Sequence, residues 1–106
     1  MSKLIPVVAV ADLPPGARLH FDLAEESVIL LNIDGDLYCI ADLCTHDGGP
    51  LTDGNVCDHQ IECPRHGARF DVRSGRVTRP PAADPIPTYP VRIEDGIILI
   101  EEPDYW

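Results

Sequence analysis

The chain has 106 residues, of which 44% are hydrophobic and 25% are charged, so it predicts one small globular domain with little room for a large catalytic cavity. Eight Lys and Arg residues stand against 18 Asp and Glu residues, and the formal net charge of −10 argues against nucleic acid or an anionic membrane as the main partner. The apolar run near the N-terminus is broken by Pro6 and Asp12. It is too short for a secretory signal or a membrane span, and we expect a cytoplasmic protein.

The expected secondary structure is all-β. Short runs rich in β-branched and apolar residues predict strands over 4–10, 17–22, 27–33, 37–41, 88–94 and 97–101. Asp34-Gly35 and Asp95-Gly96 each lie between two such runs, a pattern typical of a tight hairpin. Five arginines from Arg65 to Arg79 have the spacing of one helical face. Glycine and strand-forming residues between them argue against a helix.

Residues 42–67 differ in composition from the rest of the chain. They hold three of the four His, three of the four Cys and four of the eight Gly, with almost no continuous apolar run. Apolar burial cannot order such a segment, so we expect a metal centre to hold it in shape. Residues 80–90 contain five prolines and predict either a stiff connection or a cover over the metal loops.

Two Cys/His pairs carry the metal prediction. Cys44 and His46 form one pair, Cys63 and His66 form the other, and the sixteen residues 47–62 separate them. Two thiolates and two imidazoles make a closed ligand set that suits zinc, an iron–sulfur cluster or copper. Structural zinc sites usually place two or more residues between paired ligands. The single residue between Cys44 and His46 therefore favours two iron atoms, with both Cys on one and both His on the other.

This pattern resembles the Rieske family motif, in which Cys-x-His is followed after a similar gap by Cys-x-x-His-Gly. The resemblance continues through Phe70-Asp71, Ser74-Gly75, Pro80-Pro81-Ala82, Tyr89-Pro90-Val91-Arg92 and Glu94-Asp95-Gly96. It implies a single Rieske domain over residues 1–106, built from three stacked antiparallel sheets with a loop-rich cluster-binding subdomain of about 42–68. It also implies one Rieske [2Fe–2S] cluster per chain, bound by Cys44, His46, Cys63 and His66.

A cluster with four protein ligands has no open coordination position, so it carries one electron and binds no substrate. The resemblance accordingly implies a ferredoxin rather than an enzyme, with no catalytic residues of its own. It would pass electrons from a flavin-dependent reductase to a terminal, aromatic-ring-hydroxylating oxygenase, and we expect it to be a monomer. Three alternatives stay open: the Rieske-like small subunit of an assimilatory nitrite reductase, a structural Cys2His2 zinc module, and a pH-responsive or regulatory Rieske protein.

The other Cys and His residues are not expected to bind the metal. Cys39 and Cys57 each lie in a predicted strand and are expected to be structural thiols. His20 is predicted to face solvent on its strand, and His59 has no Cys at the motif spacing. Arg65 lies beside His66 in the one basic segment, residues 64–80, which has five arginines and one aspartate. Arg65 is either a docking charge for a partner protein or a solvated loop residue.

Overall fold

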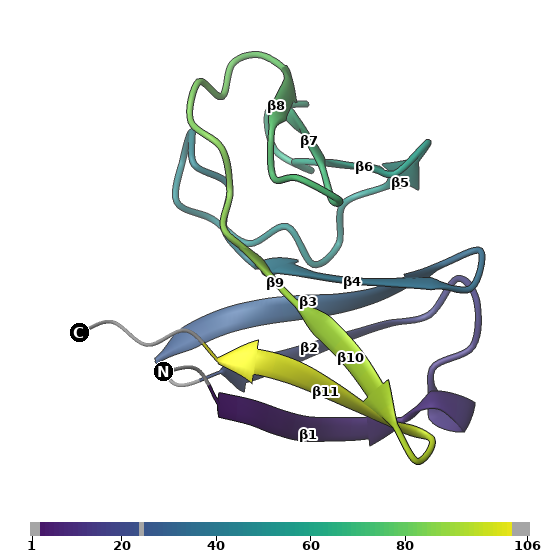
Figure 1. The fold of residues 1–106 in the computed structure, drawn as a ribbon. Coiled ribbons are helices and arrows are strands. Elements are labelled where there is room, and N and C mark those ends of the chain that lie inside the picture. Colours follow the sequence, from purple (N-terminus) through teal and green to yellow (C-terminus); the bar gives the residue numbers. More distant parts are fainter. Residues whose placement is uncertain (1–2, 24, 103–106) are drawn as a thin grey trace.

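The computed structural model describes residues 3–23 and 25–102, which form three stacked antiparallel sheets (Figure 1). The first sheet contains β1 (Lys3–Ala9), β11 (Ile97–Glu102) and β10 (Val91–Glu94), in that order. The middle sheet contains β2 (Arg18–Leu23), β3 (Glu26–Ile33), β4 (Asp36–Ala41) and β9 (Thr88–Tyr89). The third sheet contains β5 (Val56–Cys57), β6 (Gln60–Glu62), β7 (Arg69–Asp71) and β8 (Val77–Arg79). The predicted all-β class is therefore confirmed.

The described residues include one helix, the 3-10 turn η1 (Val10–Asp12), which follows β1. Its backbone is tied to the β10–β11 turn by a hydrogen bond from the Val10 N–H to the Gly96 carbonyl at 2.9 Å. No helix in this part of the chain is long and apolar enough to cross a membrane. The arginines from Arg65 to Arg79 lie on loops and on β7 and β8, so the helical spacing among them is coincidental.

The middle sheet is buried on both faces, which explains the unbroken apolar run of β3. Side chains alternate between the two faces of a strand. Val28 and Leu30 belong to the core shared with the first sheet, where Ile98 and Ile100 also lie. Ile29 and Leu31 belong to a second core, which also contains the two motif cysteines, Cys44 and Cys63. One face of the middle sheet therefore packs against the metal loops.

Three tight turns shape the hairpins. Asp34-Gly35 joins β3 to β4 and Asp95-Gly96 joins β10 to β11, and all four residues have positive φ angles between 52° and 97°. Both predicted hairpins are confirmed, with the backbone typical of a type I′ turn. Asp58 and His59, at φ 51° and 61°, form a third such turn between β5 and β6. No glycine marks that turn in the sequence.

The single strand predicted over 88–94 is wrong, because the chain forms two strands there. β9 pairs with β4 in the middle sheet, whereas β10 pairs with β11 in the first sheet. Pro90 lies between them and has no N–H with which to continue a ladder. The chain therefore changes sheets at this proline.

The third sheet and both Cys/His motifs lie on one excursion from the middle sheet. β4 ends at Ala41, β9 begins at Thr88, and the two strands pair antiparallel through Ile40 and Thr88. In Figure 1 the chain leaves the middle sheet at the end of β4, builds the upper layer and returns at β9. The predicted cluster-binding subdomain, 42–68, contains both motifs, and the third sheet continues beyond it to Arg79.

Candidate metal centre

The two motif loops have the same backbone hydrogen bonds. In the first loop, residues 44–49, the Cys44 N–H donates to the Gly49 carbonyl at 2.8 Å and the Gly48 N–H donates to the Cys44 carbonyl at 2.7 Å. In the second loop, residues 63–68, the Cys63 N–H donates to the Ala68 carbonyl at 2.7 Å and the Gly67 N–H donates to the Cys63 carbonyl at 3.0 Å. Both cysteines therefore begin matching turns, from opposite sides of one site.

A glycine closes each of these turns in the left-handed region. Gly48 has φ +75° and Gly67 has φ +76°, a conformation that other L-residues rarely adopt. The Gly after His66 in the second motif is thus a backbone requirement, and Gly48 meets the same requirement in the first loop. Sequence reasoning noted the second glycine through the family motif and gave no role to the first.

The motif thiols and imidazoles differ in exposure. Cys44 and Cys63 are buried, at 0% and 1% exposed, among the side chains of the second core. The His46 and His66 rings are exposed, with centroids 5.1 Å apart and planes at 82°. The site therefore has a buried sulfur side and an exposed imidazole side.

The donor atoms of the motif residues fall into two groups, not one. The Cys44 and Cys63 sulfurs lie within 4.8 Å of each other, and so do ring nitrogens of His46 and His66. Among the described residues, no group of three within that distance combines a thiol with an imidazole. A single tetrahedral ion needs all four donors around one centre. The arrangement fits two metal atoms, one between the thiols and one between the imidazoles, as in a Rieske cluster.

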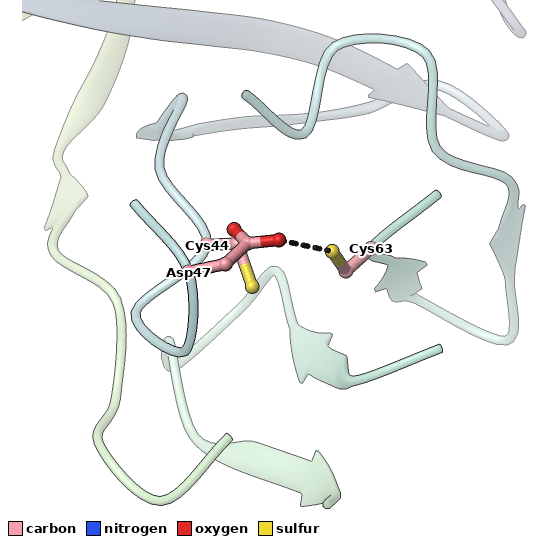
Figure 2. A group of neighbouring side chains, drawn as sticks. All are labelled: Cys44, Asp47 and Cys63. Atoms are coloured by element: carbon pink, nitrogen blue, oxygen red, sulfur yellow. Dashed lines mark hydrogen bonds between the residues drawn. The ribbon is translucent and has the colours of Figure 1, made fainter. Parts of the chain in front are cut away.

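Asp47 has a carboxylate oxygen within 4.8 Å of the donor atoms of both groups, and Figure 2 shows that carboxylate facing the Cys63 sulfur. Its Oδ2 accepts a weak hydrogen bond from the Cys63 Sγ at 3.9 Å and lies 3.6 Å from the His66 Nε2. The guanidinium of Arg65, hydrogen-bonded to Asp47, holds the pKa of that carboxyl well below its ordinary value. Sequence reasoning missed Asp47, although it adjoins the first motif.

Burial sets the protonation of the first thiol. It raises the pKa of Cys44, outweighing backbone hydrogen bonds from Asp47 and His46 that lower it, and the nearby Cys63 thiol acts in the same direction as burial. A metal cation reverses this preference because it stabilises the thiolate directly. The buried pair is therefore suited to a bound metal.

The proline segment connects β8 to β9, as the stiff connection was expected to do, and it also packs against the first metal loop. The Thr45 hydroxyl donates to the Asp84 carbonyl at 2.6 Å. Ala82 and Ile86 are buried in the same core as Cys44. These contacts attach residues 82–86 to the first motif loop and to the core around the thiols.

Asp42 connects the first loop to the middle sheet. Its Oδ1 accepts the Leu51 N–H at 2.6 Å, and its Oδ2 accepts the Thr52 hydroxyl at 2.5 Å. The His20 Nε2 lies 3.2 Å from the same Oδ2. His20 is 47% exposed, so it faces solvent as predicted, but the sequence gave no sign of its carboxylate partner.

The remaining candidates lie outside the donor groups. Cys39 is buried, as predicted, and burial raises its pKa to about 12. Cys57 is exposed on β5, so its predicted place as a packed structural thiol is wrong. The His59 ring contacts Tyr38 edge-to-face, with centroids 5.7 Å apart. Arg65 is not the freely solvated residue of one interpretation, since Asp47 and the Pro50 carbonyl bind its guanidinium.

Three stacked β-sheets that present paired thiols and paired imidazoles on matching loops define a small domain for a dinuclear metal cluster. The chain belongs to the Rieske [2Fe-2S] domain family, whose model matches residues 3–90.

Named relatives agree with this membership. The chain is 38% identical over 96 residues to the 3-phenylpropionate/cinnamic acid dioxygenase ferredoxin subunit of Escherichia coli K12, covering 90% of each. It is 36% identical over 99 residues to the ferredoxin component of the naphthalene 1,2-dioxygenase system of Pseudomonas aeruginosa, covering 93% and 95%. It also resembles a chain in the complex of reduced oxygenase and oxidized ferredoxin in carbazole 1,9a-dioxygenase, with a TM-score of 0.84, 26% identity, and coverage of 92% and 91%.

Proposed function

We propose that this chain is the ferredoxin component of a multicomponent aromatic-ring-hydroxylating oxygenase system. It is a one-electron carrier with one Rieske [2Fe–2S] cluster, and it delivers electrons to a terminal oxygenase. The separation of buried thiols from exposed imidazoles carries the proposal, because it gives the site two metal positions and one accessible edge. Relatives that cover the same length are ferredoxin components of aromatic dioxygenases.

The ligand assignment is part of this proposal. Cys44 and Cys63 would hold one iron through thiolates, and His46 and His66 would hold the other through ring nitrogens. When bound, a Rieske cluster supplies one-electron oxidation and reduction. The chain's own residues shield the sulfur side with the second core and the proline segment. They leave the imidazole edges exposed, where a partner protein can approach.

The electron donor in this proposal is a flavin-dependent reductase, and the chain itself catalyses no reaction. The formal net charge of −10 favours partners whose docking surfaces are basic. Free thiol ligands suit a reducing compartment, so the proposal places the protein in the cytoplasm, as a monomer. Neither nucleic acid nor a membrane surface suits so acidic a chain.

The test is spectroscopic and kinetic. The purified protein should be red-brown, contain about two iron atoms per chain and give the low-average-g signal of a reduced Rieske centre. A colourless protein that contains zinc would refute the cluster. Chemically reduced protein should then be reoxidised by a terminal oxygenase, followed by stopped-flow absorbance. Copurification with a sirohaem subunit, with no transfer to any oxygenase of a panel, would favour the nitrite reductase alternative instead.

A further inference from the structure

In the two matching motif loops, Asp47 occupies the position equivalent to His66, and Arg65 occupies the position equivalent to His46. Counting from each cysteine, the first loop has His46 at the second residue and Asp47 at the third. The second loop has Arg65 at the second residue and His66 at the third. Each loop therefore uses one of these two equivalent positions for a histidine and the other for a charged residue. The two charged residues have opposite signs.

These charged side chains bind each other across the site. The Arg65 Nε donates to the Asp47 Oδ2 at 2.6 Å, and the Arg65 Nη2 donates to the Asp47 Oδ1 at 3.0 Å. The third nitrogen, Nη1, donates to the Pro50 carbonyl at 2.8 Å. Two parallel bonds between a guanidinium and a carboxylate form the fork geometry that fixes direction as well as distance. All three nitrogens of a second-loop side chain thus bind the segment that contains the first loop.

The first loop provides the space that the guanidinium needs. A Cβ added at Gly49 would lie 2.6 Å from the Arg65 Cζ and 2.6 Å from its Nη2. The Gly49 N–H also donates to the Asp47 Oδ1 at 2.9 Å, which holds the carboxylate in place. The Asp47 side chain is 18% exposed and the Arg65 side chain 34%, so solvent screens the pair only in part.

We propose that Asp47 and Arg65 are positioning residues that form a clamp between the two ligand loops and slow the loss of the cluster. The proposal rests on the proposed function for the identity of the cluster. All four cysteines are free, so no disulfide joins the loops. Asp47 also lies close to the Cys63 thiol and the His66 imidazole. A change in the position of Asp47 would therefore disturb two of the proposed cluster ligands. Partners of this kind affect metal affinity about 10- to 100-fold.

The clamp changes the interpretation of Arg65 as a docking charge. Its positive charge is matched by a carboxylate at hydrogen-bond distance, so the pair presents little net charge to an approaching protein. A matched control lies at the end of β7, outside both motif loops. Arg73 makes an equivalent fork to Asp71, at 3.0 Å and 2.8 Å, but these residues are two apart in the chain and join no loops.

The experiment measures cluster loss from the purified holoprotein, as decay of visible absorbance in the presence of an iron chelator. Arg65→Gln and Asp47→Asn should each lose the cluster about tenfold faster than wild type. The double variant should lose the cluster clearly more slowly than the product of the two single effects, because both changes remove the bond between Asp47 and Arg65. Arg73→Gln should lose the cluster at the wild-type rate. Additive effects in the double variant, or equal effects of Arg65→Gln and Arg73→Gln, would overturn the clamp.

Gly49→Ala tests the packing without changing a charge. Its φ is not in the left-handed region, so the added methyl group acts only through the space that the guanidinium occupies. It should accelerate cluster loss as Arg65→Gln does, and it should add nothing in the Arg65→Gln background. A wild-type rate for Gly49→Ala would overturn the proposed packing.

A second readout separates the clamp from the proposed function. Amide exchange of Gly48 and Gly67, whose N–H groups close the two loops, is measured on the protein as purified. Arg65→Gln should reduce protection at both amides, and Arg73→Gln should leave them unchanged. Protection unaltered by Arg65→Gln would refute the clamp, whatever the metal. A wild-type protein without a [2Fe–2S] cluster would refute the proposed function, while the exchange measurement would still decide the clamp. The EPR line shape of the reduced cluster should change in Arg65→Gln and stay unchanged in Arg73→Gln.

Discussion

Arg18 connects the middle sheet to the segment that follows the first motif loop, and its removal should destabilise the whole protein. Its Nη1 donates to the Thr52 carbonyl at 2.7 Å and to the Gly54 carbonyl at 2.8 Å. Gly54 is buried, so Arg18→Ala leaves a buried acceptor without this donor. Hydrogen bonds that involve a charged group contribute about 1.5–3 kcal/mol each. We expect a loss of about 3 kcal/mol in the free energy of unfolding, since one half-buried nitrogen makes both bonds.

The assay is urea unfolding of the holoprotein under anaerobic conditions, followed by circular dichroism. With a urea slope of about 1–3 kcal/mol per M, the expected loss lowers the midpoint by roughly 1–3 M. Arg92→Ala, an exposed arginine on β10, is the control for loss of one positive charge. Arg18→Lys should recover part of the stability, because an ammonium can still reach a carbonyl. A loss below about 1 kcal/mol, or one equal to that of Arg92→Ala, would show that the two carbonyls do not depend on Arg18.

Three further predictions concern the metal centre and the buried thiol. Cys63→Ser should lose the visible absorbance and the amide protection of residues 42–67, because metal binding orders that segment; equal protection with and without cluster would contradict this. Burial raises the pKa of Cys39 from 9.0 to about 12 in the folded state, so above pH 9 the thiol ionises in the unfolded chain before it ionises in the folded one. The free energy of unfolding should therefore be constant below pH 9 with respect to this group and fall as pH rises from 9 to about 12. The free energy of unfolding, measured by urea unfolding from pH 8 to 10.5, should fall by up to about 1.4 kcal/mol per pH unit above pH 9, and Cys39→Ala should lack this fall. Identical pH dependence in the two proteins would refute the prediction. The midpoint potential should be roughly −150 mV and should rise in Ala68→Ser with Phe70→Tyr, because hydroxyl donors near cluster sulfur favour the reduced state; voltammetry giving more than about +100 mV in the wild type would contradict this.

The strands of the two lower sheets could be predicted from the sequence because apolar runs and turn signals coincide there. Asp34-Gly35 marks a hairpin whose strands match the prediction to within one residue at each end. Asp95-Gly96 marks a second hairpin, whose first strand begins only after Pro90 rather than at residue 88. Of the third sheet, only the short strand around Cys57 was predicted, because each of its strands is two or three residues long and carries too little pattern. The Asp58-His59 turn was missed for a related reason. Neither residue is glycine, although Asp and His tolerate positive φ better than most residues.

The motif residues were predictable from the sequence, whereas the contacts that support them were not. Two cysteines and two histidines stand at fixed spacing in the chain, so their shared site could be inferred before the fold was known. Asp47 and Arg65 are 18 residues apart, and their bond depends on how two loops face each other. The same holds for His20 on β2 and Asp42, which follows β4. Such partnerships are set by tertiary structure, and no local pattern encodes them.

The pairing of Ile40 with Thr88 has a consequence for dissecting this protein. Entry to and exit from residues 42–87 lie on neighbouring strands, so a short turn would join them without altering the two lower sheets. The trimmed chain would then expose Ile29, Leu31 and Ile40, which now lie in the core beneath the metal loops. A contiguous aliphatic patch on a small protein promotes self-association. The layer that carries the metal centre thus also covers an apolar surface of the middle sheet. The chain without residues 42–87 should therefore precipitate or dimerise.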